Sequence, residues 1–163
     1  MDAQVQNRMV LSLPSNVEIV ITRDFNAPCG KVFDAWTKPE QVRQWYGCGE
    51  MSLVTCEIDL RVGGAYRYVL VGPDGAEHAM TGEYLEIVRP SRLVYTERYV
   101  SEHFESDEAF VTVTFAEFDG RTTLTSTVLH KSAANRDMHL NSGVEKGARL
   151  TLDRLELLLR TMD

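Results

Sequence analysis

The sequence has few cysteines, no long apolar run and fewer basic than acidic side chains. Its three cysteines, Cys29, Cys48 and Cys56, form no Cys-x-x-Cys pair, and an odd, low number favours a reducing, cytoplasmic setting. No run approaches the ~20 apolar residues that a membrane helix needs, so we expect no membrane insertion. The formal net charge is −7, which argues against a nucleic-acid partner because phosphate binding depends on clustered lysine and arginine.

Motifs for metal, nucleotide or nucleophilic chemistry are also missing. His78, His103, His130 and His139 are scattered and form no His-Glu-x-x-His pair, so a metal site would have to be assembled from distant segments. The sequence contains no G-x-S-x-G, phosphate-loop or dinucleotide glycine pattern. We therefore expect no metal and no cofactor, and no motif assigns a catalytic residue.

The length and composition indicate one globular domain. The chain has 163 residues, 44% of them hydrophobic and 25% charged, which is an ordinary composition for such a domain. The N-terminal segment, residues 1–16, has an acid at position 2 and only a short apolar patch, which is not a secretory signal. We expect a frayed tail or a short extra element there, and a single domain over residues 17–162.

The first part of that domain reads as a strand followed by two short helices. The β-branched run "VEIVITRDF" predicts a strand over residues 17–25. Pro28 suits the first turn of a helix. Thr37 and Glu40 have the spacing of a capping box, which predicts that a second helix starts there.

The middle of the chain alternates between strand-like runs and turn signals. Asp119-Gly120 is typical of a tight hairpin, and the acidic segment 105–109 reads as a solvated loop. With the first strand this predicts seven strands, and short connections favour antiparallel neighbours. The six consecutive runs are residues 51–60, 65–71, 78–88, 92–100, 109–118 and 122–130.

The C-terminal part predicts a short turn over residues 131–140 and then one long helix. Ser142 and Glu145 again have capping-box spacing. A helix of about 20 residues spans about 30 Å, enough to cover the apolar face of the sheet. Gly147 lies inside this helix, where glycine costs roughly 1 kcal/mol relative to alanine, so we expect it to leave space for a close sheet or for a ligand. One apolar face is formed by Val144, Ala148, Leu152, Leu155 and Leu159.

Four segments of the chain together resemble a known family. They are "ITRDFNAPCGKVFDAWTKPEQVRQWYG", "DLRVGGAYRYVLVGPDG", "TGEYLEIVRPSRLVYTE" and "SGVEKGARLTLDRLELLL". In this order they resemble the activator-of-heat-shock-protein-90-ATPase homologue-like family of the START-like, or polyketide-cyclase-like, superfamily. The resemblance covers about residues 17–159. It implies an α+β helix-grip fold, in which a curved antiparallel sheet of about six to seven strands wraps around the long C-terminal helix, with two short helices after the first strand.

The resemblance implies a cavity but names no ligand. The superfamily includes lipid and sterol carriers and aromatic cyclases. Many relatives have a tryptophan after the glycine that opens the long helix, where this chain has Val144; a smaller residue there is expected to enlarge or reshape the cavity. Only about sixteen residues precede the first predicted strand, whereas the eukaryotic co-chaperones have a separate domain there. We therefore do not expect the chaperone partnership to carry over.

Alternation along the predicted strands selects the candidate cavity residues. Tyr66 and Tyr68 share one strand face, and so do Tyr95 and Glu97. A carboxylate facing a cavity has a raised pKa and can serve as an acid or base. Ordinary core packing of the rings, and an exposed or ion-paired Glu97, are the alternatives. The predicted cavity-lining residues are Trp36, Trp45, Tyr66, Tyr68, Tyr95, Glu97, Val113, His130, Val144 and Ala148.

Three functions stay open from the sequence. The first is binding of a small, mostly hydrophobic molecule between the sheet and the C-terminal helix. The second is a cyclase- or isomerase-like enzyme that acts on a polyketide-type substrate. The third is a protein-interaction module, as a homodimer for example, whose cavity is filled by its own side chains.

Overall fold

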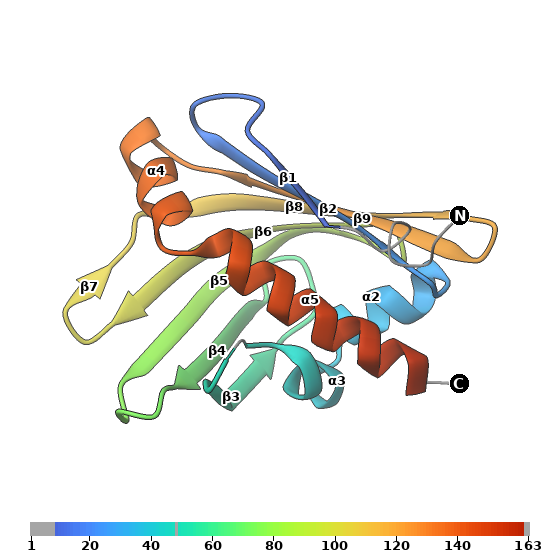
Figure 1. The fold of residues 1–163 in the computed structure, drawn as a ribbon, viewed down its shortest axis with the longest axis horizontal. Coiled ribbons are helices and arrows are strands. Elements are labelled where there is room, and N and C mark those ends of the chain that lie inside the picture. The colour runs from blue at the N-terminus through green and yellow to red at the C-terminus, as the bar shows by residue number, and fades with distance from the viewer. Residues whose placement is uncertain (1–8, 48, 162–163) are drawn as a thin grey trace.

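The computed structural model describes residues 9–47 and 49–161, which form one curved antiparallel sheet with helices against its concave side (Figure 1). This is the α+β helix-grip architecture that the sequence predicts. In chain order the elements are β1 (Val10–Ser12), β2 (Glu18–Phe25), α2 (Cys29–Thr37), α3 (Pro39–Trp45), β3 (Ser52–Ile58), β4 (Ala65–Val71), β5 (Glu77–Val88), β6 (Arg92–Ser101), β7 (Phe104–Glu105), β8 (Ala109–Phe118), β9 (Arg121–Leu129), α4 (Ala133–Asn141) and α5 (Val144–Thr161).

The strands follow the order β1-β2-β9-β8-β6-β5-β4-β3, and β7 pairs with β6. All of these pairings are antiparallel. The six consecutive predicted strands therefore form the expected meander, and the last of them returns to lie beside β2. The hairpin at Asp119 and Gly120 is also present, with positive φ at both residues, the backbone that an Asp-Gly turn of this kind requires.

The sheet has more strands than the predicted seven: the described residues contain nine. The first addition, β1, lies in the N-terminal segment and pairs Val10 with Thr22 of β2. The second, β7, includes Glu105 of the segment expected to be a solvated loop, and pairs it with Val100. Both strands have three residues or fewer, too few for an alternating pattern to be recognised in the sequence.

The break between α2 and α3 differs in detail from the predicted capping box. The Thr37 hydroxyl donates to the carbonyl oxygen of Phe33 at 2.8 Å, so it stabilises the end of α2. Lys38 is the N-terminal cap of α3, with extended backbone and no side-chain capping bond, and Pro39 follows at the start of the helix. A proline disfavours helical backbone in the residue before it, which explains why the break falls at Lys38.

The chain between β9 and α5 also differs from the prediction. A helix, α4, stands where a short turn was expected, and Ser132 caps it by accepting the N–H of Asn135 at 3.1 Å. The predicted capping box at the start of α5 is wrong, because the Ser142 hydroxyl donates back to the carbonyl oxygen of His139. Gly143, with φ of 91°, turns the chain into α5 instead.

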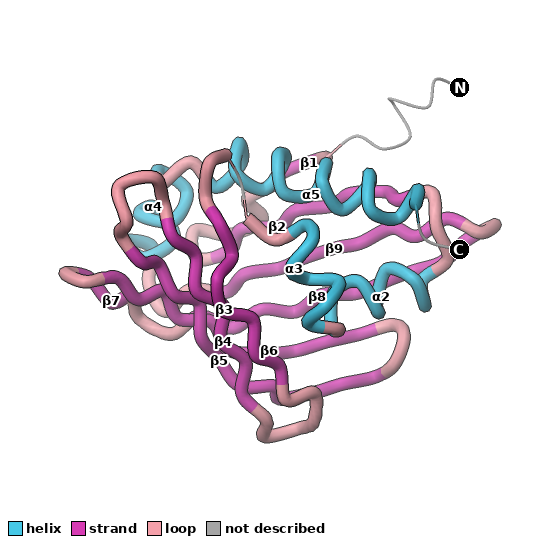
Figure 2. Tube along the Cα trace, turned by 90° about the horizontal axis from the view of Figure 1, so that it is seen from below, coloured by secondary structure: helices cyan, strands magenta, loops and turns pink. Residues whose placement is uncertain are grey.

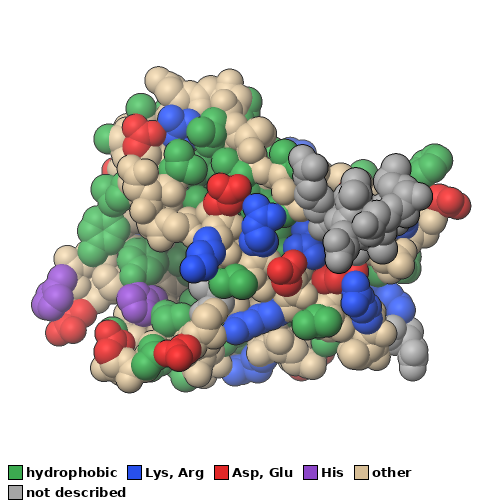
Figure 3. All heavy atoms as spheres, in the orientation of Figure 1, with side chains coloured by type: hydrophobic (Ala, Val, Ile, Leu, Met, Phe, Trp, Pro, Cys, Tyr) green, Lys and Arg blue, Asp and Glu red, His purple; other side chains and the backbone are tan. Residues whose placement is uncertain are grey.

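The long helix α5 runs along the concave side of the sheet and packs against α2, α3 and α4 (Figure 2). Its predicted apolar face is the inward one, with Leu152, Leu155 and Leu159 buried. Arg23, a buried side chain of β2, ties the helix to the sheet by donating to Asp153 at 2.6 Å. Basic and acidic side chains are interspersed over the face of the molecule that Figure 3 shows.

The core fills the space between the sheet and the helices. Phe33 of α2 meets Phe115 of β8 edge to face, with ring centroids 5.5 Å apart, a favoured aromatic geometry. Leu93, Leu124 and Leu155 are fully buried beside them. This packed half of the molecule holds the sheet and α2 in fixed positions next to a second cluster, which is built almost entirely of aromatic rings.

Candidate ligand-binding site

A small cavity lies between the α2–α3 pair and strands β4, β5 and β6; we call it the aromatic cavity. Its volume is about 40 Å³. Since about 10–15 Å³ of such space holds one water molecule, it has room for a group of only a few heavy atoms. The lining residues are Trp36, Val42, Trp45, Tyr46, Tyr66, Tyr68, Tyr84, Tyr95 and Glu97.

The alternation of β4 directs Tyr66 and Tyr68 to the same side, and the next strand leaves room for one of them. Gly82 of β5 is the cross-strand partner of Tyr66. A Cβ atom at Gly82 would lie 2.6 Å from Cε1 of the Tyr66 ring, closer than any real contact. The glycine therefore allows the ring to lie across β5.

The hydroxyl of Tyr66 reaches beyond β5 to β6. It donates to the carbonyl oxygen of Thr96 at 2.7 Å, and the N–H of Glu83 donates to the Thr96 hydroxyl at 3.0 Å. These two bonds lie between the regular pairs Thr81–Arg98 and Tyr84–Tyr95. The side chains of Tyr66 and Thr96 thus satisfy one backbone carbonyl and one backbone N–H of the sheet, next to Glu97.

Trp45 closes the helical side of the cavity and is held by a buried hydrogen bond. Its indole N–H donates to the carbonyl oxygen of Ala35 at 2.8 Å. In a continuous helix that carbonyl would accept from the residue four positions on, but this residue is Pro39, which has no N–H. The indole therefore satisfies a carbonyl that the break between the helices leaves open, and its ring packs against Trp36 in a tilted arrangement with centroids 5.0 Å apart.

Glu97 is the carboxylate of the aromatic cavity. Its side chain is half-buried, and the surrounding rings exclude water from it. Burial raises the pKa of Glu97 to about 7, since a carboxyl group that loses water loses most of the stabilisation of its charged form. Near neutral pH this side chain can therefore carry or release a proton.

The tyrosine hydroxyls around Glu97 stay protonated. Burial raises the pKa of Tyr66, Tyr68, Tyr84 and Tyr95 well above the ordinary value. The charge of Glu97 further raises the pKa of Tyr66 and Tyr95. The cavity thus offers one ionisable carboxyl group among neutral phenols and indoles.

The structure brings six of the ten predicted cavity residues together: Trp36, Trp45, Tyr66, Tyr68, Tyr95 and Glu97 all line the aromatic cavity. Val113 is instead fully buried in the hydrophobic core, on the strand that packs against α2. Val144 and Ala148 lie half-buried on α5, and neither is among the residues that line the cavity, nor is Gly147. The cavity is thus covered by α2 and α3 rather than by α5.

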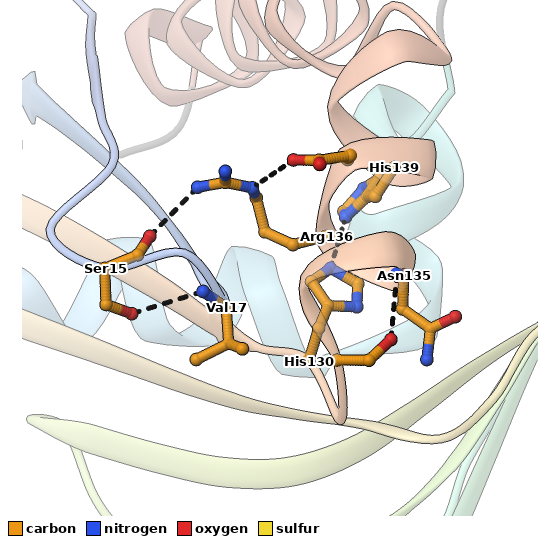
Figure 4. A network of polar contacts seen from close by, with 8 residues as sticks. Ser15, Val17, His130, Asn135, Arg136 and His139 are labelled. Carbon is orange, nitrogen blue, oxygen red and sulfur yellow. Dashed lines mark hydrogen bonds and ion pairs between the residues drawn. The ribbon is translucent and has the colours of Figure 1, made fainter.

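His130 lies in a different polar cluster, at the end of β9 (Figure 4). Its Nε2 is 3.0 Å from Nδ1 of His139 on α4. Burial is the main cause that lowers the pKa of both imidazoles, that of His139 to about 4. Close by, Arg136 donates to the carbonyl oxygen of Ser15 at 2.9 Å. This cluster joins α4 to the β1–β2 connection.

Three cavity residues were not among the predicted ones: Val42, Tyr46 and Tyr84. Tyr84 carried a usable signal, because it lies two residues from Gly82 on the strand beside Tyr66 and Tyr68. Tyr46 directly follows Trp45, where the helix ends and a helical period no longer predicts direction. Its ring packs on Tyr68 with centroids 4.7 Å apart.

Neither a metal cluster nor a membrane helix is found in the part of the chain that the structure describes. No group of three or more His, Cys, Asp or Glu side chains in residues 9–47 and 49–161 is placed to hold a metal ion. No helix over the same residues is long and apolar enough to cross a membrane. Cys48, one of the three cysteines, lies outside the described residues, and the thiols of Cys29 and Cys56 are free.

Residues 26–160 match the model of one protein family, described as Activator of Hsp90 ATPase homolog 1-like protein. This chain belongs to that family. The match spans both helices of the cavity wall, all three strands behind it and nearly all of α5. It therefore covers the whole candidate site. Among curated proteins, none matches the chain by sequence.

Solved structures of bacterial proteins share the fold of this family member over almost its whole length. A Staphylococcus epidermidis protein is 30% identical, with a TM-score of 0.80 over 95% of this chain and 96% of its own. A Rhodobacter sphaeroides protein is 22% identical, with a TM-score of 0.89 over 96% and 100%. A Mycobacterium smegmatis protein is 23% identical, with a TM-score of 0.85 over 96% and 99%. The last two likenesses concern the fold alone.

Proposed function

We propose that this protein binds a small, mostly apolar molecule in the aromatic cavity. The observation that carries the proposal is the lining itself: seven aromatic rings, one valine and one desolvated carboxyl group converge on a single space. Ligand sites in proteins are typically apolar and aromatic, with a few polar groups that orient the ligand. The helix-grip fold of the family is consistent with such a role.

The size of the cavity limits what enters without rearrangement. About 40 Å³ accommodates a small group, and a larger ligand would have to displace side chains of the wall. Tyr46 is placed for such a movement, because it follows the last residue of α3 and lies outside any regular element. We expect a bound molecule to leave Tyr66 in place, because its hydroxyl is tied to Thr96.

Native mass spectrometry and a thermal-shift screen of small aromatic and aliphatic compounds test this proposal. Val42→Leu adds one methylene to the cavity wall and should reduce both a co-purifying mass and the ligand-induced rise in melting temperature. Val54→Leu is the matched control, because Val54 lies on β3 with 52% of its surface exposed, and it should leave binding unchanged. A screen with no bound mass and no shift would contradict the proposal.

The small volume also favours one alternative, an interaction module whose interior is filled by its own side chains. In that case the surface rather than the cavity carries the function, and a homodimer is the simplest assembly. Light scattering after size-exclusion chromatography measures the oligomeric state. A dimer to which no compound of the screen binds would support this alternative.

A second alternative follows from Glu97. A carboxyl group with a pKa near 7 is suited to proton transfer at neutral pH, as a cyclase- or isomerase-like reaction on a polyketide-type substrate requires. A bell-shaped dependence of kcat/KM on pH, lost in Glu97→Gln, would support it.

A further inference from the structure

The aromatic cavity has an electrostatic character that its apolar lining does not suggest at first. The face of an aromatic ring carries partial negative charge, and seven rings border the space. Tyr66 alone packs against three of its neighbours, with centroids between 5.2 and 5.6 Å apart. The one ionisable acid in the wall, Glu97, adds a full negative charge when its proton leaves. The described wall contains no lysine, arginine or histidine.

Two other acids of the fold have their charges balanced by arginines, whereas Glu97 lies among aromatic rings without such a partner in the described residues. Asp34 pairs with Arg89 at 2.7 Å, and Asp153 pairs with Arg23. Within residues 9–47 and 49–161, Glu97 accepts no hydrogen bond and forms no ion pair. Burying an unpaired charge is costly, which is why its pKa is raised to about 7. A ligand that supplied a positive charge would remove this cost.

The other groups that line the cavity around Glu97 carry no positive charge. The strands contribute tyrosines whose hydroxyls stay neutral, and α2 and α3 contribute two indoles and Val42. Arg154 of α5 is engaged by the chain that follows α3. Its guanidinium donates to the carbonyl oxygens of Gly47 and Gly49, both at 2.8 Å.

We propose that the aromatic cavity is specific for a small organic cation, an ammonium group on a short apolar ligand, held by the carboxylate of Glu97 and the faces of the surrounding rings. This inference rests on the proposed function and adds the chemical class of the ligand. A cation over an aromatic face is attracted by the ring, more strongly when it is desolvated, and the carboxylate adds a charge-assisted hydrogen bond. The small volume selects a primary ammonium group over a bulkier quaternary one.

Comparing amines with alcohols of equal size separates the contribution of charge to the binding affinity from that of shape. Isothermal titration compares ethylammonium with ethanol and n-propylammonium with 1-propanol. At pH 8 we expect each amine to bind the wild-type protein at least tenfold more tightly than its alcohol. In Glu97→Gln this preference should fall to less than threefold, while Glu83→Gln, at an exposed position on β5, should keep it.

The pH dependence gives a second readout. Because only the ionised carboxylate pairs with the cation, the Kd of an amine should rise about tenfold for each pH unit below pH 7 and should be constant just above it. Proton release on binding, measured in buffers of different ionisation enthalpy, should be largest below pH 7. Circular dichroism checks that Glu97→Gln is folded, and Glu97→Asp, which keeps the charge on a shorter side chain, should bind amines with intermediate affinity.

The outcomes distinguish this inference from the proposed function. If alcohols bind wild type as tightly as amines, or if only uncharged compounds of the wider screen bind, the cavity is a ligand site but not a cation site, and the inference is wrong. If no compound of either kind binds, the proposed function itself fails. Amine binding that survives Glu97→Gln unchanged would overturn the role of the carboxylate.

Discussion

The ring of Tyr66 lies across Gly82, its partner on the neighbouring strand, and no side chain larger than hydrogen fits between them. A Cβ atom at Gly82 would meet the carbonyl oxygen of Thr96 as well as Cε1 and the hydroxyl oxygen of Tyr66, the latter two at 2.6 and 2.7 Å. One glycine on β5 thus permits a contact that links three strands and builds the wall of the aromatic cavity.

Gly82→Ala should therefore destabilise the protein by about 1–3 kcal/mol or more, the usual range for forcing extra volume into a packed site. Urea denaturation measures the change. Gly30→Ala is the control, because a Cβ atom at Gly30 meets nothing within 4 Å and alanine suits a helix better than glycine. Equal stability of the two variants would show that the sheet adapts to the added methyl group.

Glu97→Gln should change the pH dependence of stability. The pKa of Glu97 is raised from 4.5 to about 7 in the folded protein, so the native state binds this proton more tightly than the unfolded state. The contribution of Glu97 to the free energy of unfolding therefore falls as pH rises from about 4.5 to 7 and is constant above that.

The variant has no such group, so its stability relative to wild type should increase between pH 5 and pH 7 and then stay level. Taking the difference removes the contribution of His130 and His139, which is common to both proteins. Urea denaturation at pH 5, 6, 7 and 8 gives the comparison. A difference that does not vary with pH would mean that Glu97 is ionised and solvated in the folded state.

Trp45→Phe should destabilise the protein by about 1–3 kcal/mol. The variant keeps an aromatic ring but leaves the buried carbonyl oxygen of Ala35 without its donor, and an unsatisfied buried polar group costs about that much. Differential scanning calorimetry measures the shift in Tm. A loss below about 0.5 kcal/mol would show that water replaces the indole N–H at the break made by Pro39.

Asp153→Ala should destabilise the protein more than the double variant Arg23→Met, Asp153→Ala. The single change leaves the buried guanidinium of Arg23, 5% exposed, without its carboxylate. The double change replaces the cation with an apolar chain of similar length, and removing both partners is generally better tolerated than removing one. Denaturation of both variants and of Arg23→Met completes the cycle. A double variant less stable than Asp153→Ala would contradict this account.

The sequence by itself determined the long strands and helices and their order, but not β1, β7 and α4. Alternation of apolar residues predicted the meander, and a helical repeat predicted the buried face of α5, because these periods are local properties of the chain. The resemblance of four segments supplied the helix-grip fold. Alternation also selected Tyr66, Tyr68, Tyr95 and Glu97, since residues two apart on a strand share a face.

The tertiary structure decided where the helices begin and which side chains meet in the cavity, because local patterns do not determine either. The capping boxes at Thr37 and Ser142 failed because Pro39 and Gly143 fix the chain direction more strongly than a side-chain hydroxyl does. His130 and Val113 face the same side of the sheet as the cavity residues, but the curvature of the sheet places them over other neighbours. Whether Glu97 meets a cation or only aromatic rings depends on which side chains of β4, β5, α2 and α3 converge on it, and no spacing within one segment encodes that convergence.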